Sequence, residues 1–419
     1  MGCEMLLLDQ ARSASQIARS RRLILVRTLL LVAAMLLCCQ IPHTTSSASA
    51  QGLAPFELPD ILSASGAVAY SGQDEQQTTK IIEGIVNKTG GIQGHPLKFV
   101  YLDDQSNPQV AVQLMSGLIS HNAQVVLGPT FTAPCAAVAP LVEKSGPFMY
   151  CLTPGFQPAR GGYVTSPGTS TPDVDETYLR YMVTKHWTRL AVLTTTDATG
   201  QAAVVALQPR LALPEFQSVK LVAMESMNAA DISVNAQLQR IKAAQPDMIY
   251  FTGSGPPYAT TLRGLIDAGM DIPVASSSAN MTLALMQQYK EILPKTALFT
   301  ASRGLAVAAT PKGPIHDAQR LLFKSFEAAK IQIDGVNVLP WDPTWILITA
   351  LRHLGPNATA SQVRDYVLNL HGWVGINGVY NFSRDNRGIG SDSVVVYRWD
   401  PAKVNFVPAS GPGGAAQRK

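Results

Sequence analysis

Two loops rich in threonine, glycine and proline follow predicted strands, at the ends where ligands bind in open α/β sheets. The first, residues 128–132 (GPTFT), directly precedes a helix that Pro134 would begin. Free N–H groups and the dipole at a helix N-terminus favour a negative charge there. This loop predicts binding of an anionic group, with the alternative that Thr132 only caps its helix. The second loop is residues 153–157 (TPGFQ).

Motifs that carry enzymatic chemistry are missing from the sequence. It contains none of the patterns G-x-x-x-x-G-K-[ST], G-x-S-x-G or H-E-x-x-H, and Gly253-Ser254-Gly255 lacks the third glycine of a dinucleotide-binding loop. Adjacent Asp103-Asp104 fits the turn after a strand better than a metal site. We therefore predict no catalytic residue, no metal and no cofactor. The histidines after residue 50 are not closely paired, which favours structural roles; they are His95, His121, His186, His316, His353 and His371.

Length and composition exclude several classes of protein. The chain has 419 residues, 46% of them hydrophobic and 15% charged, which is too apolar for a disordered protein and long enough for two lobes. The formal net charge of +4 is concentrated near the N-terminus, because residues 1–50 hold five arginines and two acids. The remaining residues carry 28 basic and 27 acidic side chains. No basic stripe remains, so nucleic acid is excluded as a partner.

The N-terminal 50 residues have the pattern of an export signal. Basic residues 19–27 (RSRRLILVR) precede an apolar run at 29–39, and Ala48-Ser49-Ala50 forms an A-x-A cleavage pattern. The apolar run is too short for a permanent membrane span, although a retained anchor is the alternative. The sequence therefore predicts a signal peptide over 1–50, cleaved near Ala50, and a periplasmic mature chain.

Five cysteines are present, of which Cys3, Cys38 and Cys39 belong to the predicted signal peptide. Cys135 and Cys151 remain in the mature chain. An oxidising compartment permits a disulfide between them, and the alternative is two small buried hydrophobic residues. Both interpretations stay open at this point.

Strand and helix patterns alternate along the mature chain. Strands alternating with crossover helices predict an α/β protein of two doubly wound, Rossmann-like units with parallel sheets, joined near residues 165–172. The predicted strands are residues 59–64, 97–103, 124–127, 147–152, 190–194, 219–224, 246–252, 272–275 and 393–399. The predicted helices are 73–88, 108–121, one from Pro134, 173–186, 232–244, 257–268, 312–330, 343–353 and 360–369.

Four segments together resemble one family. They are residues 65–76 (SGAVAYSGQDEQ), 85–112 (IVNKTGGIQGHPLKFVYLDDQSNPQVAV), 125–155 (VVLGPTFTAPCAAVAPLVEKSGPFMYCLTPG) and 246–270 (PDMIYFTGSGPPYATTLRGLIDAGM). Their order and spacing resemble the solute-binding proteins of branched-chain amino-acid-type ABC importers. The resemblance extends over residues 57–405.

This resemblance implies the type I periplasmic-binding fold, in which two lobes joined by a three-strand hinge close on a small solute. Lobe 1 would comprise residues 56–168 and 303–382. Lobe 2 would comprise residues 169–302 and 383–410. Residues 411–419 are expected to form a disordered tail.

In the resembling family, loops of lobe 1 bind the ligand carboxylate. The hydroxyl that does so matches Thr132, and the backbone donors match Gly155 and Phe156. Gln157 stands where a small hydroxyl residue is common, which puts that contact in doubt. The ring often present at Ser71 could be supplied by Tyr70, with surface packing as its alternative. The same loops contribute Thr130, Phe131 and Thr153 to the expected ligand-binding set.

Lobe 2 departs from the family pattern. Ser278 stands where amino-acid binders have the acid that holds the ligand ammonium, and an aromatic position falls near Ser254 or Gly255. A buried ammonium without a partner is costly, so Asp197 is the alternative acid. The ligand is therefore expected to be either an amino acid or an amine-free aromatic or aliphatic carboxylate.

The resemblance implies a binding function without chemistry. The chain would be the extracytoplasmic, monomeric substrate-binding subunit of an ABC importer, delivering its solute to an inner-membrane permease. One alternative is a sensory protein that reports the solute to a receptor. A second is a Rossmann-type enzyme, which the missing motifs argue against.

Overall fold

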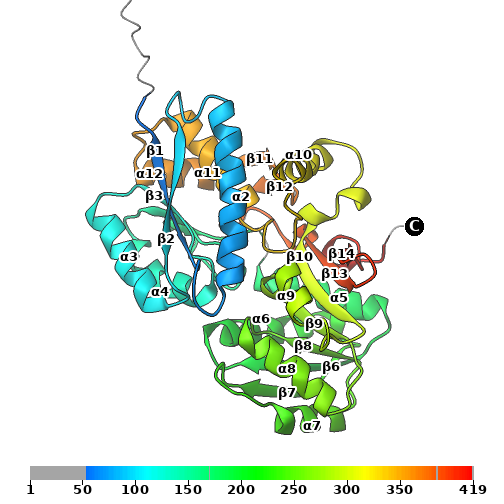
Figure 1. Cartoon of the computed structure of the whole chain (residues 1–419). Helices are drawn as coiled ribbons and strands as arrows, with labels where there is room; N and C mark the ends of the chain where they lie inside the picture. Colours follow the sequence, from blue (N-terminus) through cyan, green and yellow to red (C-terminus); the bar gives the residue numbers. More distant parts are fainter. Residues whose placement is uncertain (1–52, 169, 384–385, 418–419) are drawn as a thin grey trace, which may run out of the picture. The chain divides into compact units, whose positions relative to one another are not determined.

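Parallel β-sheets flanked by helices form the described part of the chain. The computed structural model in Figure 1 describes residues 53–168, 170–383 and 386–417. The predicted signal peptide, residues 1–50, lies outside the described residues. No helix in the described ranges is both long and apolar enough to cross a membrane.

The first sheet has five parallel strands in the order β2-β1-β3-β4-β5. This order reverses direction between β1 and β3, and such a switch point opens a crevice at the carboxyl ends of the strands. The strands are β1 (Phe56–Leu62), β2 (Leu97–Asp103), β3 (Val125–Leu127), β4 (Phe148–Tyr150) and β5 (Val164–Thr165).

The second sheet repeats the pattern with seven strands, in the order β14-β13-β10-β9-β8-β6-β7. Strands β6 to β10 are parallel, with a second switch point between β6 and β8, and β13 runs antiparallel to β10. The strands are β6 (Arg189–Thr195), β7 (Lys220–Met227), β8 (Met248–Phe251), β9 (Val274–Ser277), β10 (Ala297–Ser302), β13 (Val394–Asp400) and β14 (Asn405–Pro408).

Alternating side chains bury both faces of the first sheet. Val125 and Leu127 point into one hydrophobic cluster, whereas Val126 between them points into another with Cys135 and Met149. This period of two explains the continuous apolar run of β3. The helices packed with this sheet are α2 (Ala69–Lys88), α3 (Pro108–Ser120), α4 (Thr132–Val142), α10 (Pro314–Ala329), α11 (Trp341–Leu354) and α12 (Ala360–Leu368).

The second sheet is covered in the same way on its two faces. One face packs against α5 (Thr171–Thr184) and α6 (Ala198–Leu211), and the other against α7 (Asn235–Ala243), α8 (Pro256–Asp267) and α9 (Leu283–Gln288). A small hairpin of β11 (His371–Val374) and β12 (Val379–Asn381) lies beyond α12 in sequence. The α/β fold with parallel sheets is confirmed.

The cores draw on discontinuous parts of the chain. Residues 322–382 share a hydrophobic cluster with the first sheet, and residues 394–406 share clusters with the second. The described chain passes between the sheets after β5, after β10 and after β12. The expected lobe boundaries and three-strand hinge remain predictions, and these observations support them.

The C-terminal residues differ from the expected disordered tail. Residues 412–414 form a short 3-10 turn packed against α5, and Arg180 donates a hydrogen bond to the Gly413 carbonyl. A Cβ on Gly414 would lie 2.1 Å from the Thr177 carbonyl oxygen. The missing side chain therefore permits a close backbone contact that composition did not indicate.

Candidate functional site

A cavity at the carboxyl ends of both sheets brings the predicted loops together. The space between its walls is about 840 Å³, including open solvent at its mouth. Eight of the predicted residues line it: Ser71, Thr130, Phe131, Thr132, Thr153, Gly155, Ser254 and Ser278. Five do not: Tyr70, Phe156, Gln157, Asp197 and Gly255.

The loop between β3 and α4 places Thr130 and Thr132 at the cavity. Gly128 has a φ of +82°, and a Cβ there would lie 1.9 Å from the Ile61 carbonyl oxygen, so this turn requires glycine. Thr132 is the first residue of α4, and the capping position belongs to Phe131, whose side chain makes no capping hydrogen bond. Thr132 therefore does not cap the helix, and no side chain covers the first N–H groups of α4.

The loop after β4 faces Thr132 directly. The Thr132 and Thr153 hydroxyl oxygens lie 2.9 Å apart, and the Gly155 N–H donates to the Thr153 hydroxyl over 3.3 Å. A Cβ on Gly155 would lie 2.2 Å from the Thr132 hydroxyl, so glycine is needed for this approach. Hydroxyl groups and backbone N–H groups thus converge at the N-terminus of α4.

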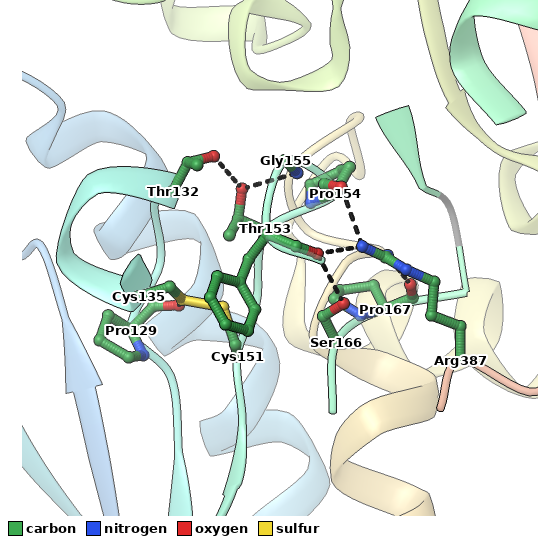
Figure 2. Close-up of a disulfide and its surroundings, with 11 residues drawn as sticks. Pro129, Thr132, Cys135, Cys151, Thr153, Pro154, Gly155, Ser166, Pro167 and Arg387 are labelled. Atoms are coloured by element: carbon green, nitrogen blue, oxygen red, sulfur yellow. Dashed lines mark hydrogen bonds between the residues drawn. A yellow bond between two sulfur atoms is a disulfide. The ribbon is translucent and has the colours of Figure 1, made fainter. Parts of the chain in front are cut away.

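A disulfide joins the two loops at their base. Cys135 in the first turn of α4 is bonded to Cys151 just after β4, with the Cα atoms 6.1 Å apart. Figure 2 shows this bond beneath Thr132 and Thr153, on the side away from their hydroxyl groups. Of the two interpretations left open by the sequence, the disulfide is the one the structure contains.

Phe156 and Gln157 turn away from the cavity. The Phe156 side chain packs against the hydrophobic cluster around Cys151, and its carbonyl accepts hydrogen bonds from Ser166 and Arg387. Gln157 is exposed to solvent. Neither side chain lines the cavity, and the expected backbone donor at Phe156 stays a prediction.

Helix α2 begins at Ala69, four residues before the predicted start, and this changes which of its residues reach the site. The Tyr70 ring packs against the core of the second sheet rather than lining the cavity. Ser71 and Glu75 are one helical turn apart and both line the cavity. Glu75 is 1% exposed, and neither of its carboxylate oxygens makes a hydrogen bond of ordinary geometry.

The wall from the second sheet carries hydroxyl groups and an amide-braced loop. The Asn280 side chain donates to the Gly253 carbonyl over 2.9 Å and accepts from the Gly255 N–H over 3.3 Å. These two hydrogen bonds hold the loop so that Ser254 lines the cavity. Gly255 faces the Ala67 carbonyl, which precedes α2 in the half of the molecule built on the first sheet.

Asp197 has a structural role instead of the expected one. Its carboxylate caps α6 by accepting hydrogen bonds from the Thr199 and Gly200 N–H groups, both over 3.1 Å. It also accepts the Thr195 hydroxyl proton over 2.8 Å. The carboxylate is therefore occupied away from the cavity, and Asp197 is not the acid that faces the ligand space.

The charges at the cavity are few. Among the residues that line it, only Glu75 and Tyr250 carry ionisable side chains, and none is Lys, Arg or His. Burial raises the pKa of Glu75 well above its usual value; the Thr130 hydroxyl opposes this, and nearby Asp60 and Asp104 add to it. Burial and the neighbouring Asp175 likewise raise the pKa of Tyr250 well above its usual range, so its phenol stays neutral.

Pro154, Ser277 and Ala279 also line the cavity and lie in the segments 153–157 and 276–280 that the sequence placed at the ligand. Several other lining residues were missed by sequence reasoning. They come from helices, strand ends and a loop, and no local motif distinguishes them. They are Glu75, Leu152, Thr171, Val174, Thr199, Ala203, Tyr250, Thr252, Thr300, Ala301, Val336, Leu339 and Val394. Metal-binding clusters of three or more His, Cys, Asp or Glu are not found among the described residues.

Comparison with known proteins gives consistent results. Residues 59–404 match the sequence profile of the family described as periplasmic binding protein. A leucine-, isoleucine-, valine-, threonine- and alanine-binding protein of Pseudomonas aeruginosa is 24% identical over 215 residues, which is 49% of this chain and 56% of the relative. The chain thus matches little more than half the length of that curated relative.

Solved structures show the same fold at low identity. An extracellular ligand-binding receptor from Rhodopseudomonas palustris superposes with a TM-score of 0.73 at 18% identity, covering 85% of this chain and 99% of that one. A solute-binding protein of an ABC transporter from R. palustris, solved in complex with benzoate, has a TM-score of 0.70 at 16% identity, covering 86% and 97%.

Proposed function

The chain belongs to the periplasmic binding protein family, and on this premise we propose that it captures a small carboxylate-bearing solute for an ABC importer. Like its relatives, the protein binds a solute and catalyses no reaction. Three points of this proposal go beyond family membership: the ligand carries a carboxylate, the partner is an ABC importer, and the protein is exported. One relative is named for amino acids, and a similar solved structure contains benzoate. Both kinds of ligand have a carboxylate group.

One observation carries the proposal for a carboxylate. The Thr132 hydroxyl and the Gly155 backbone meet at the uncapped N-terminus of α4, inside a cavity. Donors and a positive helix end favour an anion, and a carboxylate needs no cationic side chain at such a site. This explains how the cavity can bind an anion although none of its lining residues is Lys, Arg or His.

Contacts from both halves of the molecule would couple binding to closure. Thr132 and Thr153 line one wall, and Ser254 and Ser278 line the other. A solute that touches both walls binds the closed arrangement more tightly than the open one and so shifts the population toward it. The closed form is what an importer's permease would recognise.

A thermal-shift screen of the chain from Gln51 onward tests the proposal. The panel contains branched-chain, aromatic and acidic amino acids, amides, and carboxylates without an amine. A ligand at 100 times its dissociation constant stabilises the folded state by about 2.7 kcal/mol, which is readily detected. If no carboxylate in the panel raises the melting temperature, the proposal fails.

Substitution of Thr132 tests the site. Thr132→Ala removes a hydrogen bond to a charged group, so we expect affinity to fall roughly tenfold to a hundredfold while the protein stays folded. Thr349→Ala is the matched control, because Thr349 bonds only within α11, to the Trp345 carbonyl. Unchanged affinity in Thr132→Ala would remove this residue from the site.

Uptake of the identified solute tests the importer. Deleting the gene is expected to abolish uptake of the radiolabelled solute. Tight binding in solution with unchanged uptake would instead favour a sensory role, since the site would be the same.

A further inference from the structure

We propose that Glu75 binds a positively charged group of the solute, so that this site selects carboxylates that also carry a protonated amine. The inference rests on the proposed function, because it assigns the second polar end of the same ligand. It differs from the sequence-based expectation, which searched for the amine-binding acid in the second half, at Ser278 and Asp197. The structure places the acid on α2 instead.

Glu75 is positioned as a ligand-binding residue would be. It lines the cavity on the same face of α2 as Ser71, whose hydroxyl also lacks a partner. The Glu75 side chain is 1% exposed, so water does not compensate for the missing hydrogen bonds. The Thr130 hydroxyl, whose oxygen accepts the Ser63 N–H over 3.2 Å, opposes the rise in the pKa of Glu75 but makes no hydrogen bond of ordinary geometry with its carboxylate.

An unpartnered buried carboxyl is costly, and only some groups could satisfy this one. No cation lies among the lining residues, and the charged groups that influence Glu75 are all acids: Asp60 on β1, Asp104 after β2 and Asp74 on α2. These acids form no metal-binding cluster among the described residues. No cationic side chain of the cavity lining can therefore stabilise the ionised form of Glu75, and a cationic group of the solute would supply that counter-charge.

Glu75 also limits what else the site can bind. A carboxylate held at Thr132 shares the cavity with Glu75, and its negative charge opposes ionisation of the Glu75 carboxyl. A solute with an ammonium between its carboxylate and Glu75 offsets this effect. An amine-free acid instead leaves Glu75 unpaired, and sites that leave a buried polar group unpaired reject the ligand strongly.

The protonation state of Glu75 provides a second readout. Burial, together with Asp60, Asp104 and Asp74, raises the pKa of Glu75 well above its usual value, which favours the protonated carboxyl in the empty site. An ammonium favours the ionised form. Binding of an amine-bearing solute should therefore lower this pKa and favour proton release from Glu75.

Isothermal titration with matched ligand pairs tests the inference. The pairs are leucine and 4-methylpentanoate, phenylalanine and 3-phenylpropanoate, and glutamate and glutarate. For the wild-type chain, we expect the amine-bearing member of a binding pair to bind roughly 100-fold more tightly than its amine-free analogue. Glu75→Gln should reduce this ratio to within about tenfold.

Glu83→Gln is the matched control, because Glu83 lies on the same helix and its carboxylate accepts the Phe99 N–H over 2.7 Å outside the cavity. It should leave the ratio unchanged. Proton release is measured on the wild-type chain as the dependence of the binding enthalpy on the ionisation enthalpy of the buffer, so this readout does not depend on a variant that folds. Glu75→Gln should abolish it.

The outcomes separate the inference from the proposed function. Equal wild-type affinity for both members of a pair overturns the role of Glu75 and leaves solute capture standing. So does a ratio unchanged in Glu75→Gln. No binding by any member of the three pairs or of the thermal-shift panel overturns the carboxylate function, and the role of Glu75 with it.

Discussion

Removing the disulfide between Cys135 and Cys151 should weaken both the fold and the site. The bond closes a loop with a sequence separation of 16 residues, and both cysteines are fully buried. Loop-closure entropy for such a loop predicts a stabilisation of about 3 kcal/mol, because the cross-link restricts the unfolded chain. The same bond fixes α4 to the loop after β4, so it also holds Thr132 beside Thr153.

Two perturbations separate the cross-link from its packing. Reduction of the wild-type chain breaks the bond and keeps both sulfur atoms, whereas the double substitution Cys135→Ala with Cys151→Ala removes bond and sulfur together. Equilibrium urea unfolding should give a loss of about 3 kcal/mol for the reduced chain. The alanine variant should lose about 1 kcal/mol more, as expected for buried atoms removed from a packed core.

Ligand titration under the same conditions checks the effect on the site. We expect weaker binding in the reduced chain, because Thr132 and Thr153 are no longer held in one arrangement and ordering them costs free energy. The reasoning is refuted if reduction shifts the unfolding midpoint by less than the equivalent of about 0.5 kcal/mol. An unchanged midpoint in the reduced chain with a large loss in the alanine variant would assign the whole effect to packing.

Two further predictions concern helix α2 and the buried carboxyl group of Asp60 on β1. Gly72→Ala should destabilise the chain by at least about 2 kcal/mol in urea unfolding, because the new Cβ would lie 2.1 Å from the Ser63 carbonyl oxygen. Gly84→Ala on the same helix meets nothing within 4 Å and should stabilise by about 0.5–1 kcal/mol; equal effects of the two would contradict this contact. Burial raises the pKa of Asp60 from 3.8 to about 7, so the folded state holds its proton more tightly than the unfolded state does. Stability should therefore fall by about 4 kcal/mol as pH rises from about 4 to about 7, and Asp60→Asn should flatten that slope.

Four of the five strands of the first sheet were predicted because their signals are local, whereas the two-residue strand β5 was not. Strand β2 has the bounds read from its apolar run, and glycine and proline marked the turns after β3 and β4. At Gly128 and Gly155 an added Cβ would meet neighbouring atoms within 2.2 Å, which is why these glycines signalled a binding loop. Thr132 and Thr153 could be placed at the cavity by their position in such loops.

The errors arose where packing decides. Asp197 was read as an acid facing the ligand because helix α6 was not predicted, so its capping role was not visible. Pro209 inside α6 and its weak apolar periodicity conceal that helix. The resemblance placed Phe156 at the ligand as a backbone donor, and its ring packs against a hydrophobic cluster outside the cavity, a position that the sequence does not specify.

Glu75 was missed for a related reason. The helix was predicted to begin at residue 73, which leaves Tyr70 and Ser71 in a loop. Without Ser71 in the helix, the prediction could not show that Glu75 lies on the face that points toward the cavity. With α2 beginning at Ala69, Ser71 and Glu75 share one face, and the close contact of Gly72 with Ser63 turns that face toward the cavity. A polar residue in a polar helix segment gives no sign of burial from sequence alone.

The position of Glu75 changes what closure would recognise. Thr132 and Glu75 both belong to the half built on the first sheet, so both charged ends of an amino acid would be held there before the second half arrives. The second wall contributes hydroxyl groups, Ser254 and Ser278 among them, together with apolar side chains, and none of its lining residues is Lys, Arg, His, Asp or Glu. Closure would then depend on the uncharged remainder of the solute, because only that part makes contacts that differ between the open and closed forms. The half built on the first sheet would accordingly distinguish amine-bearing from amine-free acids when the solute first binds. Closure of the second half would then distinguish solutes by their side chains.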